Sequence, residues 1–284
     1  MFDKISYTWG LMGASWDVLK RDKALVLFPL FSGVCCVLVL ASFIIPIFTS
    51  DILPSPDTRI TQQQQVLYYS ILFGFYFCNY FVITFFNTAI IACAMSRMAG
   101  GEPTFMGGIR EAASRVHLIA GWALVQATVG LVLRIIEDRS PKLGRFIAGI
   151  LGAVWTVLTY LVVPVMVMEN KGPIDAFKES TRLLKKTWGE QIVGNFSFGL
   201  IFFLLSLPAV GLVILGFVMG QGNGTIIIAC VALAVVYLVV LGLIQSALQA
   251  IFQAAVYMYT QGVAGGPQGF PVQLVRGAMA QSPD

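Results

Sequence analysis

Long apolar segments recur along the chain of 284 residues, and short polar stretches separate them. A helix needs about 20 apolar residues to cross roughly 30 Å of hydrocarbon, and it satisfies its own backbone hydrogen bonds there. The pattern therefore predicts an all-α, polytopic membrane protein. We place six membrane-spanning helices in a single integral membrane domain, residues 1–284, at about 24–48, 66–95, 116–133, 146–168, 192–219 and 225–259.

Four shorter segments show the spacing of apolar and charged residues that is typical of amphipathic helices. Their approximate bounds are 8–22, 106–115, 174–187 and 270–280. In the first, Leu11, Trp16 and Leu19 would face the lipid boundary, while Asp17 and Lys20 would face water. We expect these four helices on the cytoplasmic side of the membrane.

A glycine–proline motif recurs three times, each time after an apolar segment. Its copies are Gly101–Phe105, Gly172–Phe177 and Gly266–Phe270. Glycine ends the preceding helix and proline stiffens the turn, so that the phenylalanine anchors the next helix at the interface. A ligand-binding loop is the alternative. With the apolar segments, the motif predicts three repeated units, each an amphipathic helix plus two spans.

Composition and charge restrict the class and the orientation. Charged residues make up 11% of the chain and hydrophobic residues 57%, whereas soluble domains carry about 25% charged residues, so a water-soluble fold is excluded. Cytoplasmic loops are rich in Lys and Arg. A cytoplasmic N-terminus assigns thirteen basic residues to the inner side: Lys4, Lys20, Arg21, Lys23, Arg97, Arg110, Arg115, Lys171, Lys178, Arg182, Lys185, Lys186 and Arg276. The outer side then holds Arg59, Arg134, Arg139, Lys142 and Arg145. Both termini are therefore predicted inside.

The sequence offers little catalytic chemistry. It contains no Gly-x-Ser-x-Gly elbow, no phosphate-binding loop and no His-Glu-x-x-His motif. One histidine, His117, cannot form a metal site by itself, and the five cysteines lie in the spans, where we interpret them as small apolar packing residues. We predict no enzymatic activity, no cofactor, no metal and no binding of nucleic acid. A cluster of His117, Glu169 and arginines around one pocket would reopen the case for a lipid enzyme.

Polar side chains inside the spans form the first candidate site. Gln245, Gln249 and Gln253 are four residues apart in the last span and so share one helix face, and Asn79 and Asn87 form a looser polar set in the second span. The amides either hydrogen-bond between helices, each contributing about 0.6–2 kcal/mol, or line a polar path for a solute. The glutamine stripe has no ionisable member, so an ion-coupled transporter has no evident coupling residue.

Basic residues of the amphipathic helices form the second candidate site. They are Lys20, Arg21, Arg115, Arg182, Lys185 and Lys186. Such a collar attracts anionic lipid headgroups at about 1 kcal/mol per charge. The general preference of cytoplasmic loops for Lys and Arg explains the same residues without any lipid specificity.

Two resemblances add to this interpretation. The segment Trp16–Lys23, followed by Leu25–Leu30, resembles the opening of an uncharacterised family of bacterial six-helix integral membrane proteins. Met168–Lys186 is similar, more distantly, to the repeated cytoplasmic helices of membrane domains associated with glycerophosphodiester phosphodiesterases, although this sequence has no phosphodiesterase catalytic domain. The resemblances imply a multi-pass protein of the bacterial inner membrane without an assigned activity, and they supply no site residues.

The sequence favours two functions over a membrane enzyme that acts on lipid. The first is a non-enzymatic scaffold or accessory subunit of a membrane complex, which docks anionic membrane lipids, a membrane protein partner or a second copy of the chain. The alternative is a channel or transporter for a small neutral or amphipathic solute, using the polar stripe of the last span. A continuous polar path that joins this stripe to the Asn79–Asn87 face would favour the channel, and dry contact between the faces would favour the scaffold.

Overall fold

The computed structural model describes residues 13–49, 61–139, 143–220 and 224–261, and all regular structure in them is helical. Residues 13–21 are helical and lead into a 3-10 turn, η1 (Lys23–Val26). The helices that follow are α2 (Leu27–Thr49), α3 (Gln62–Met98), α4 (Phe105–Ser114), α5 (Val116–Arg139), α6 (Leu143–Leu158), α7 (Val162–Glu169), α8 (Pro173–Met219) and α9 (Gly224–Thr260). The predicted helix 270–280 and the third motif copy, Gly266–Phe270, lie outside the described residues.

Six helical segments are long and apolar enough to cross a membrane. They are Lys23–Ile45, Gln62–Met98, Val116–Arg139, Leu143–Glu169, Ile201–Met219 and Gly224–Met258. Large apolar side chains stay exposed along them, for example Leu38 in α2 and Ile228 in α9, and lipid rather than water is the solvent that accepts such surfaces. The prediction of a helical, multi-pass membrane protein with six apolar helices is confirmed.

Contacts divide the chain into two compact units. The first unit comprises Met1–Val26, Ala94–Glu102 and Thr187–Asp284, and the second comprises Leu27–Cys93 and Pro103–Lys186. The helices α3 and α8 each contribute residues to both units. The two units are described separately below.

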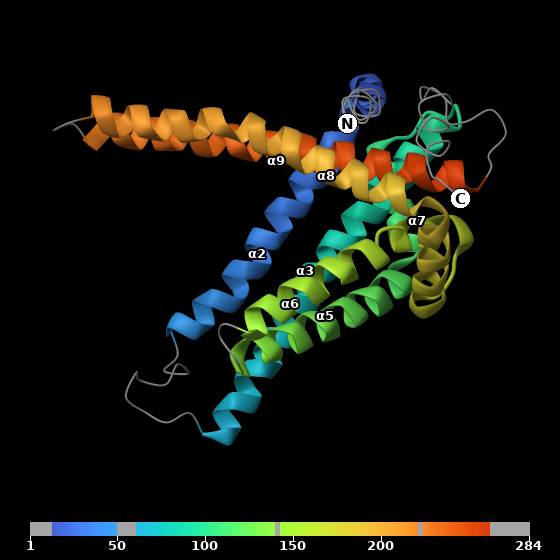
Figure 1. Ribbon diagram of the computed structural model, residues 1–284, viewed down its shortest axis with the longest axis horizontal. Helices are drawn as coiled ribbons and strands as arrows, with labels where there is room; N and C mark the ends of the chain where they lie inside the picture. The colour runs from blue at the N-terminus through green and yellow to red at the C-terminus, as the bar shows by residue number, and fades with distance from the viewer. Residues whose placement is uncertain (1–12, 50–60, 140–142, 221–223, 262–284) are drawn as a thin grey trace. The chain divides into compact units, whose positions relative to one another are not determined.

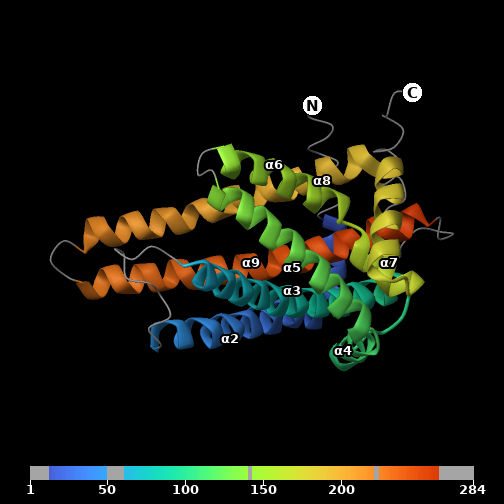
Figure 2. The same cartoon turned by 90° about the horizontal axis from the view of Figure 1, so that it is seen from below.

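In the second unit, α3, α5 and α6 lie alongside one another (Figures 1 and 2). The helix α3 approaches α5 closely at Gly130, where an added Cβ would lie 3.4 Å from atoms of Tyr76 and Tyr80. The start of α6 packs even closer to the end of α5, because a Cβ on Gly144 would overlap the carbonyl oxygen of Ile136. Glycine at these two positions therefore sets the distances between neighbouring helices.

The span predicted at 146–168 is divided into two helices, α6 and α7, by a turn at residues 159–161. Pro164 accounts for the division, because it has no N–H to bond the carbonyl of Tyr160 and its ring clashes with that carbonyl. The short helix α7 is deeply enclosed, since the residues from Val162 to Val167 are all buried. The break therefore places a short, protein-covered helix at one end of the bundle.

In the first unit, α9 and the Ile201–Met219 part of α8 run antiparallel, side by side (Figures 1 and 2). The hydroxyl of Tyr237 donates to the carbonyl oxygen of Leu205 at 2.6 Å. Nearer the turn, Gly216 allows close contact, because an added Cβ would lie 2.6 Å from the Cβ of Cys230. The sequence treats the amphipathic segment 174–187 and the span 192–219 as separate elements, whereas α8 contains both and continues through Pro208.

Candidate functional site

The turn between α3 and α4 is built by Gly100 together with the first motif copy, Gly101–Phe105. Gly100 has a φ of 88°, a left-handed conformation that suits glycine. Thr104 caps α4, since its hydroxyl accepts a hydrogen bond from the amide of Gly107 at 3.0 Å. The ring of Phe105, the first residue of α4, stacks on Phe28 of α2 with centroids 4.7 Å apart. The stacked rings hold α4 against the beginning of α2.

The turn between α7 and α8 has the same construction. Asn170 has a φ of 50°, and it precedes Pro173 by three residues, as Gly100 precedes Pro103. Pro173 occupies the first helical position, where its missing N–H costs no hydrogen bond. Phe177 then stacks on Trp155 of α6, with centroids 5.4 Å apart. Two motif copies thus perform one structural task, while the predicted threefold repeat stays a prediction, because the third copy is not described.

Arg115, a predicted headgroup residue, forms bonds within the protein. Its Nη2 donates to the carbonyl oxygen of Val167 at 2.9 Å, and its Nη1 pairs with Glu111 one turn earlier. The last carbonyls of a helix have no partner within the helix and carry partial negative charge, which attracts a cation. Arg115 is 18% exposed, so its main structural effect is to tie the beginning of α5 to the end of α7.

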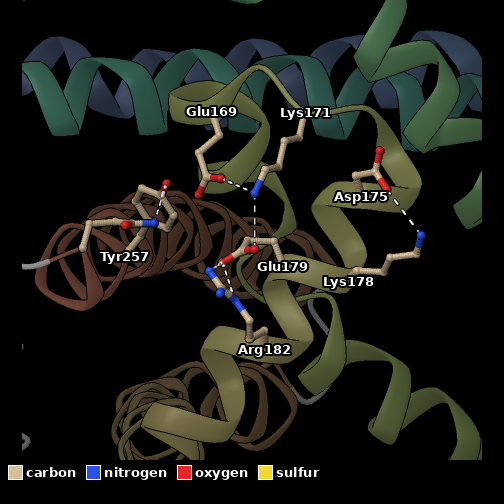
Figure 3. A network of polar contacts seen from close by, with 8 residues as sticks. Glu169, Lys171, Asp175, Lys178, Glu179, Arg182 and Tyr257 are labelled. Atoms are coloured by element: carbon tan, nitrogen blue, oxygen red, sulfur yellow. Dashed lines mark hydrogen bonds and ion pairs between the residues drawn. The ribbon is translucent and has the colours of Figure 1, made fainter.

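An ion-pair network closes the same end of the second unit (Figure 3). Lys171 bridges Glu169 and Glu179, with its Nζ 3.2 Å from Oε2 of Glu179. Arg182 donates to Oε1 of Glu179 from Nε at 3.0 Å and from Nη2 at 2.6 Å. Two carboxylates and two cations thus balance their charges, and they hold the turn after α7 against the first turns of α8.

The electrostatics of the network follow from these contacts. Burial alone raises the pKa of Glu179, but the hydrogen bonds and charges of Arg182 and Lys171 outweigh burial and hold this pKa below its ordinary value of 4.5. The pKa of Lys171 lies above its ordinary 10.5, chiefly because Lys171 hydrogen-bonds Glu169. Both side chains therefore stay charged at neutral pH, and neither is suited to exchange a proton there.

Ser180, which sequence reasoning did not single out as a site residue, bridges the break between α6 and α7. Its hydroxyl donates to the carbonyl oxygen of Leu158 at 2.8 Å and accepts from the amide of Leu161 at 3.1 Å. Ser180 is only 1% exposed, so no solvent replaces these bonds. A polar residue on the buried face of an amphipathic helix, together with Pro164 in the preceding span, was the available signal.

The remaining predicted headgroup residues differ from Arg115. Lys20 and Arg21 are exposed at the end of helix 13–21, and Lys185 is exposed in α8. None of these three forms an ion pair with any residue that the structure describes. Arg182 is also largely exposed, at 68%, although it pairs with Glu179. The side chain of Lys186 lies outside the described residues.

The predicted glutamine stripe lies near one end of the α8–α9 hairpin. Gln245 and Gln249 are half-buried and Gln253 is buried. All three glutamines lie within the apolar segment Gly224–Met258 of α9. Gln245 is eight residues beyond Tyr237, or about 12 Å along the helix.

The polar residues of α3 belong to the second unit. The Nδ2 of Asn79 donates to the carbonyl oxygen of Phe75 in its own helix, and Asn87 is half-buried. The contact that crosses between helices joins Thr84 to Gln126 of α5, at 3.1 Å. Gln126 is a residue that sequence reasoning missed, although an amide in an apolar span is the same signal that marked Asn79. Because α9 belongs to the first unit, the proposed meeting of its stripe with this face stays a prediction.

The described residues offer no arrangement that brings reactive groups together. His117 is exposed, Glu169 is paired with Lys171, and the guanidinium of Arg115 lies on the end of α7. Within the described ranges, no three His, Cys, Asp or Glu side chains gather closely enough to hold a metal ion, and none of the five cysteines forms a disulfide with another described cysteine. What these sites can do chemically is hold helices in place and attract anions.

Comparison with known families adds one assignment. The model of a "Family of unknown function (DUF6159)" matches residues 66–269, which is well over half of the chain. The chain belongs to this family. No curated protein matches the sequence. The resemblance to an uncharacterised family is therefore supported, while the comparison does not bear on the more distant resemblance to phosphodiesterase-associated membrane domains.

The family match shows which features belong to the shared part of this DUF6159 chain. It begins within α3 and extends past the end of α9, so it includes both described motif copies, Arg115 and the Glu179 network. Helix 13–21, η1 and α2 precede the matched region.

Proposed function

We propose that this protein is a non-enzymatic scaffold or accessory subunit of a complex in the bacterial inner membrane. Its helices at the cytoplasmic surface dock a membrane protein partner, a second copy of the chain, or anionic lipids. The observation that carries the proposal is the construction of the two turns at one end of the second unit. There, Phe105 and Phe177 fix the beginnings of α4 and α8 on the spans through stacked rings.

Charged residues at this end support a structural role over a catalytic one. Arg115 holds the end of α7, and Lys171 and Arg182 neutralise Glu179. Catalytic acids and bases need pKa values near the working pH, whereas the pKa of Glu179 is lowered and that of Lys171 is raised. These groups therefore stabilise a fixed layer of helices, which leaves exposed side chains such as Arg110 available to a partner.

The distribution of basic residues supports an inner position for this layer. In the second unit, Arg110, Arg115, Lys171, Lys178, Arg182 and Lys185 belong to the end where α4, α7 and the start of α8 meet. Arg134, Arg139 and Arg145 belong to the opposite end, where Tyr69 of α3 reaches Asp138 of α5. Among the described side chains of this unit, six basic residues against three support a cytoplasmic position for the first end.

A channel or transporter for a small neutral solute is the second candidate. The Thr84–Gln126 bond and the buried hydroxyl of Thr88, which has no hydrogen bond to any described residue, put polar groups inside the second unit. In the first unit, the glutamine stripe lies within the apolar segment Gly224–Met258 of α9, so it supplies a second set of polar groups. If a path exists, replacing Gln126 or Gln249 by Leu changes solute flux into proteoliposomes, whereas a scaffold shows no flux to change.

Purification of the protein from native membranes in mild detergent tests the proposal. Mass spectrometry of the purified material would identify the proteins and lipids that remain bound. A stoichiometric membrane protein, a stable homo-oligomer or retained anionic lipid supports the scaffold. A monomer that retains none of these, and that moves a solute across proteoliposomes, contradicts it and supports the channel.

A further inference from the structure

Three cations lie close together near the N-terminus. Lys20, Arg21 and Lys23, which we call the basic edge, are all exposed, and none forms an ion pair with a described residue. The carboxylate closest in sequence, Asp22, is already paired, because its Oδ2 lies 3.2 Å from Nη2 of Arg97. Asp22 is only 10% exposed, so it does not neutralise the basic edge, which keeps three positive charges within four residues.

The helix that carries the basic edge is oriented by its own burial pattern. Val18 and Leu19 are 2% and 4% exposed, whereas Trp16 is 39% exposed and lies on the open side. The ammonium of Lys20 lies over the ring of Trp16, 5.6 Å from its centroid. An exposed tryptophan beside lysine is the pair that membrane proteins place at the headgroup level, because the ring is amphipathic and the charge reaches water.

The position of the basic edge along the chain also supports a location at the headgroup level. The first helical segment that is apolar enough to cross a membrane begins at Lys23 and runs to Ile45. Lys20 and Arg21 are therefore within one helical turn of the start of this segment. Side chains at this level meet the phosphates of lipid headgroups rather than bulk solution.

We propose that the basic edge, together with Trp16, binds the phosphate of an anionic phospholipid. Lys20, Arg21 and Lys23 supply the charge, and Trp16 packs at the glycerol level beside it. This inference rests on the proposed function and deepens it, since it assigns the lipid contact to helix 13–21. Arg115 is not part of this lipid site, because its guanidinium is bonded to Val167 and Glu111.

Lipid titration of the purified full-length protein tests the site. Phosphatidylglycerol or phosphatidylcholine is added to the protein in mild detergent, and native mass spectrometry counts the bound lipids. We expect preferential binding of phosphatidylglycerol by the wild type. Each charge near an anionic surface is worth about fivefold in affinity, so the variant Lys20→Gln/Arg21→Gln should bind this lipid about 25-fold more weakly.

Two further variants make the result specific. Arg139→Gln/Arg145→Gln removes the same net charge from exposed positions of α5 and α6, and it should bind phosphatidylglycerol like the wild type. Lys20→Arg/Arg21→Lys keeps the charge and should also bind normally. Equal losses in the two neutralised variants would show a general charge effect and overturn the site, as would displacement of the lipid by millimolar inorganic phosphate, which would indicate a free-anion site.

The outcomes also separate this inference from the proposed function. If the wild type retains a partner or anionic lipid, and Lys20→Gln/Arg21→Gln retains as much, the scaffold stands and the basic edge is not its lipid site. If the wild type retains neither, both proposals fail. Helix content by circular dichroism and elution volume on gel filtration confirm that each variant is folded before its lipid binding is compared.

Discussion

At the scale of single residues, several polar side chains in this protein hydrogen-bond the backbone groups that are left unpaired where helices end. Ser180 replaces two backbone bonds at the break before Pro164, and Arg115 caps a carbonyl at the end of α7. Backbone groups that are buried without a partner cost about 1–3 kcal/mol each. A bundle with a broken span therefore depends on a few hydroxyl and guanidinium groups from neighbouring segments.

Ser180→Ala tests this dependence. The substitution leaves the Leu158 carbonyl and the Leu161 amide without the hydroxyl, so we expect the free energy of unfolding to fall by about 1–3 kcal/mol. Reversible unfolding in detergent, followed by circular dichroism, measures the change. Ser114→Ala is the matched control, because among the described residues this exposed hydroxyl bonds only the Glu111 carbonyl and the nearby Arg115 side chain. An equal effect of the two substitutions would contradict the bridging role.

The lowered pKa of Glu179 predicts a pH dependence. A carboxyl group whose pKa is lower in the folded than in the unfolded state binds fewer protons when folded, so folding is stabilised above the unfolded value. The contribution is complete above about pH 4.5, and it is lost as the pH falls through the lower folded pKa. We expect Glu179→Gln to be less stable than wild type at pH 7, with a difference that shrinks below pH 4.5.

Thermal unfolding in detergent between pH 3 and pH 7 measures that difference. Asp175→Asn serves as the control, because the Asp175–Lys178 pair is exposed on both sides and such pairs contribute little. A stability difference for Glu179→Gln that stays constant over this range would show that the ion pairs with Lys171 and Arg182 do not stabilise the fold.

At the scale of elements, the recurring construction is a helix end, a left-handed residue, a proline and an aromatic anchor. Phe177, Trp155 and Trp122 form a continuous stack, with 5.9 Å between the centroids of the two tryptophans. Phe105 makes the equivalent contact with Phe28. The stacks connect α8 to α6 and α4 to α2, so the same chemistry positions two helices that are distant in sequence.

A double-mutant cycle measures the aromatic anchor. Phe177→Leu and Trp155→Leu keep apolar volume but remove the stacked rings, and such pairs contribute about 0.5–1.5 kcal/mol beyond their buried area. We expect a coupling of that size in the free energy of unfolding. The pair Phe105→Leu and Phe28→Leu should give a similar coupling. Additive effects in both cycles would mean that the phenylalanines fill space without anchoring the helices through their rings.

The elements also show what the sequence could and could not predict. Length and hydropathy are enough to predict the six apolar helices. In lipid the backbone must satisfy its own hydrogen bonds, and a helix does so within a single segment. The break at residues 159–161 was missed, since Pro164 lies in an otherwise uniform apolar run and proline within a span does not always divide it. Ser180 and Gln126 were missed because their roles depend on contacts with Leu158, Leu161 and Thr84, which are distant in sequence.

At the scale of the whole molecule, the two ends of the second unit differ. One end carries the layer formed by α4, α7 and the start of α8, and the opposite end carries fewer basic residues. The inner assignment rests on the excess of Lys and Arg at the first end. In a protein of this kind, the apolar helices set the depth in the membrane, and the distribution of Lys and Arg sets the orientation. Orientation is therefore the property on which every proposal for the helical layer and the basic edge depends.

Cysteine labelling in a background without the five native cysteines tests this orientation. The charge-neutral, exposed positions Ser114 and Ile174 lie in the helical layer, and Thr61 and Leu143 lie at the opposite end. We expect a membrane-impermeant maleimide to label Ser114→Cys and Ile174→Cys only in inside-out vesicles, and Thr61→Cys and Leu143→Cys only in right-side-out vesicles. The reverse pattern would keep the spans but invert the molecule, and the basic edge would then meet the outer leaflet. Labelling of all four positions from one side would show that α3, α5 and the α6–α7 segment do not cross the membrane as predicted.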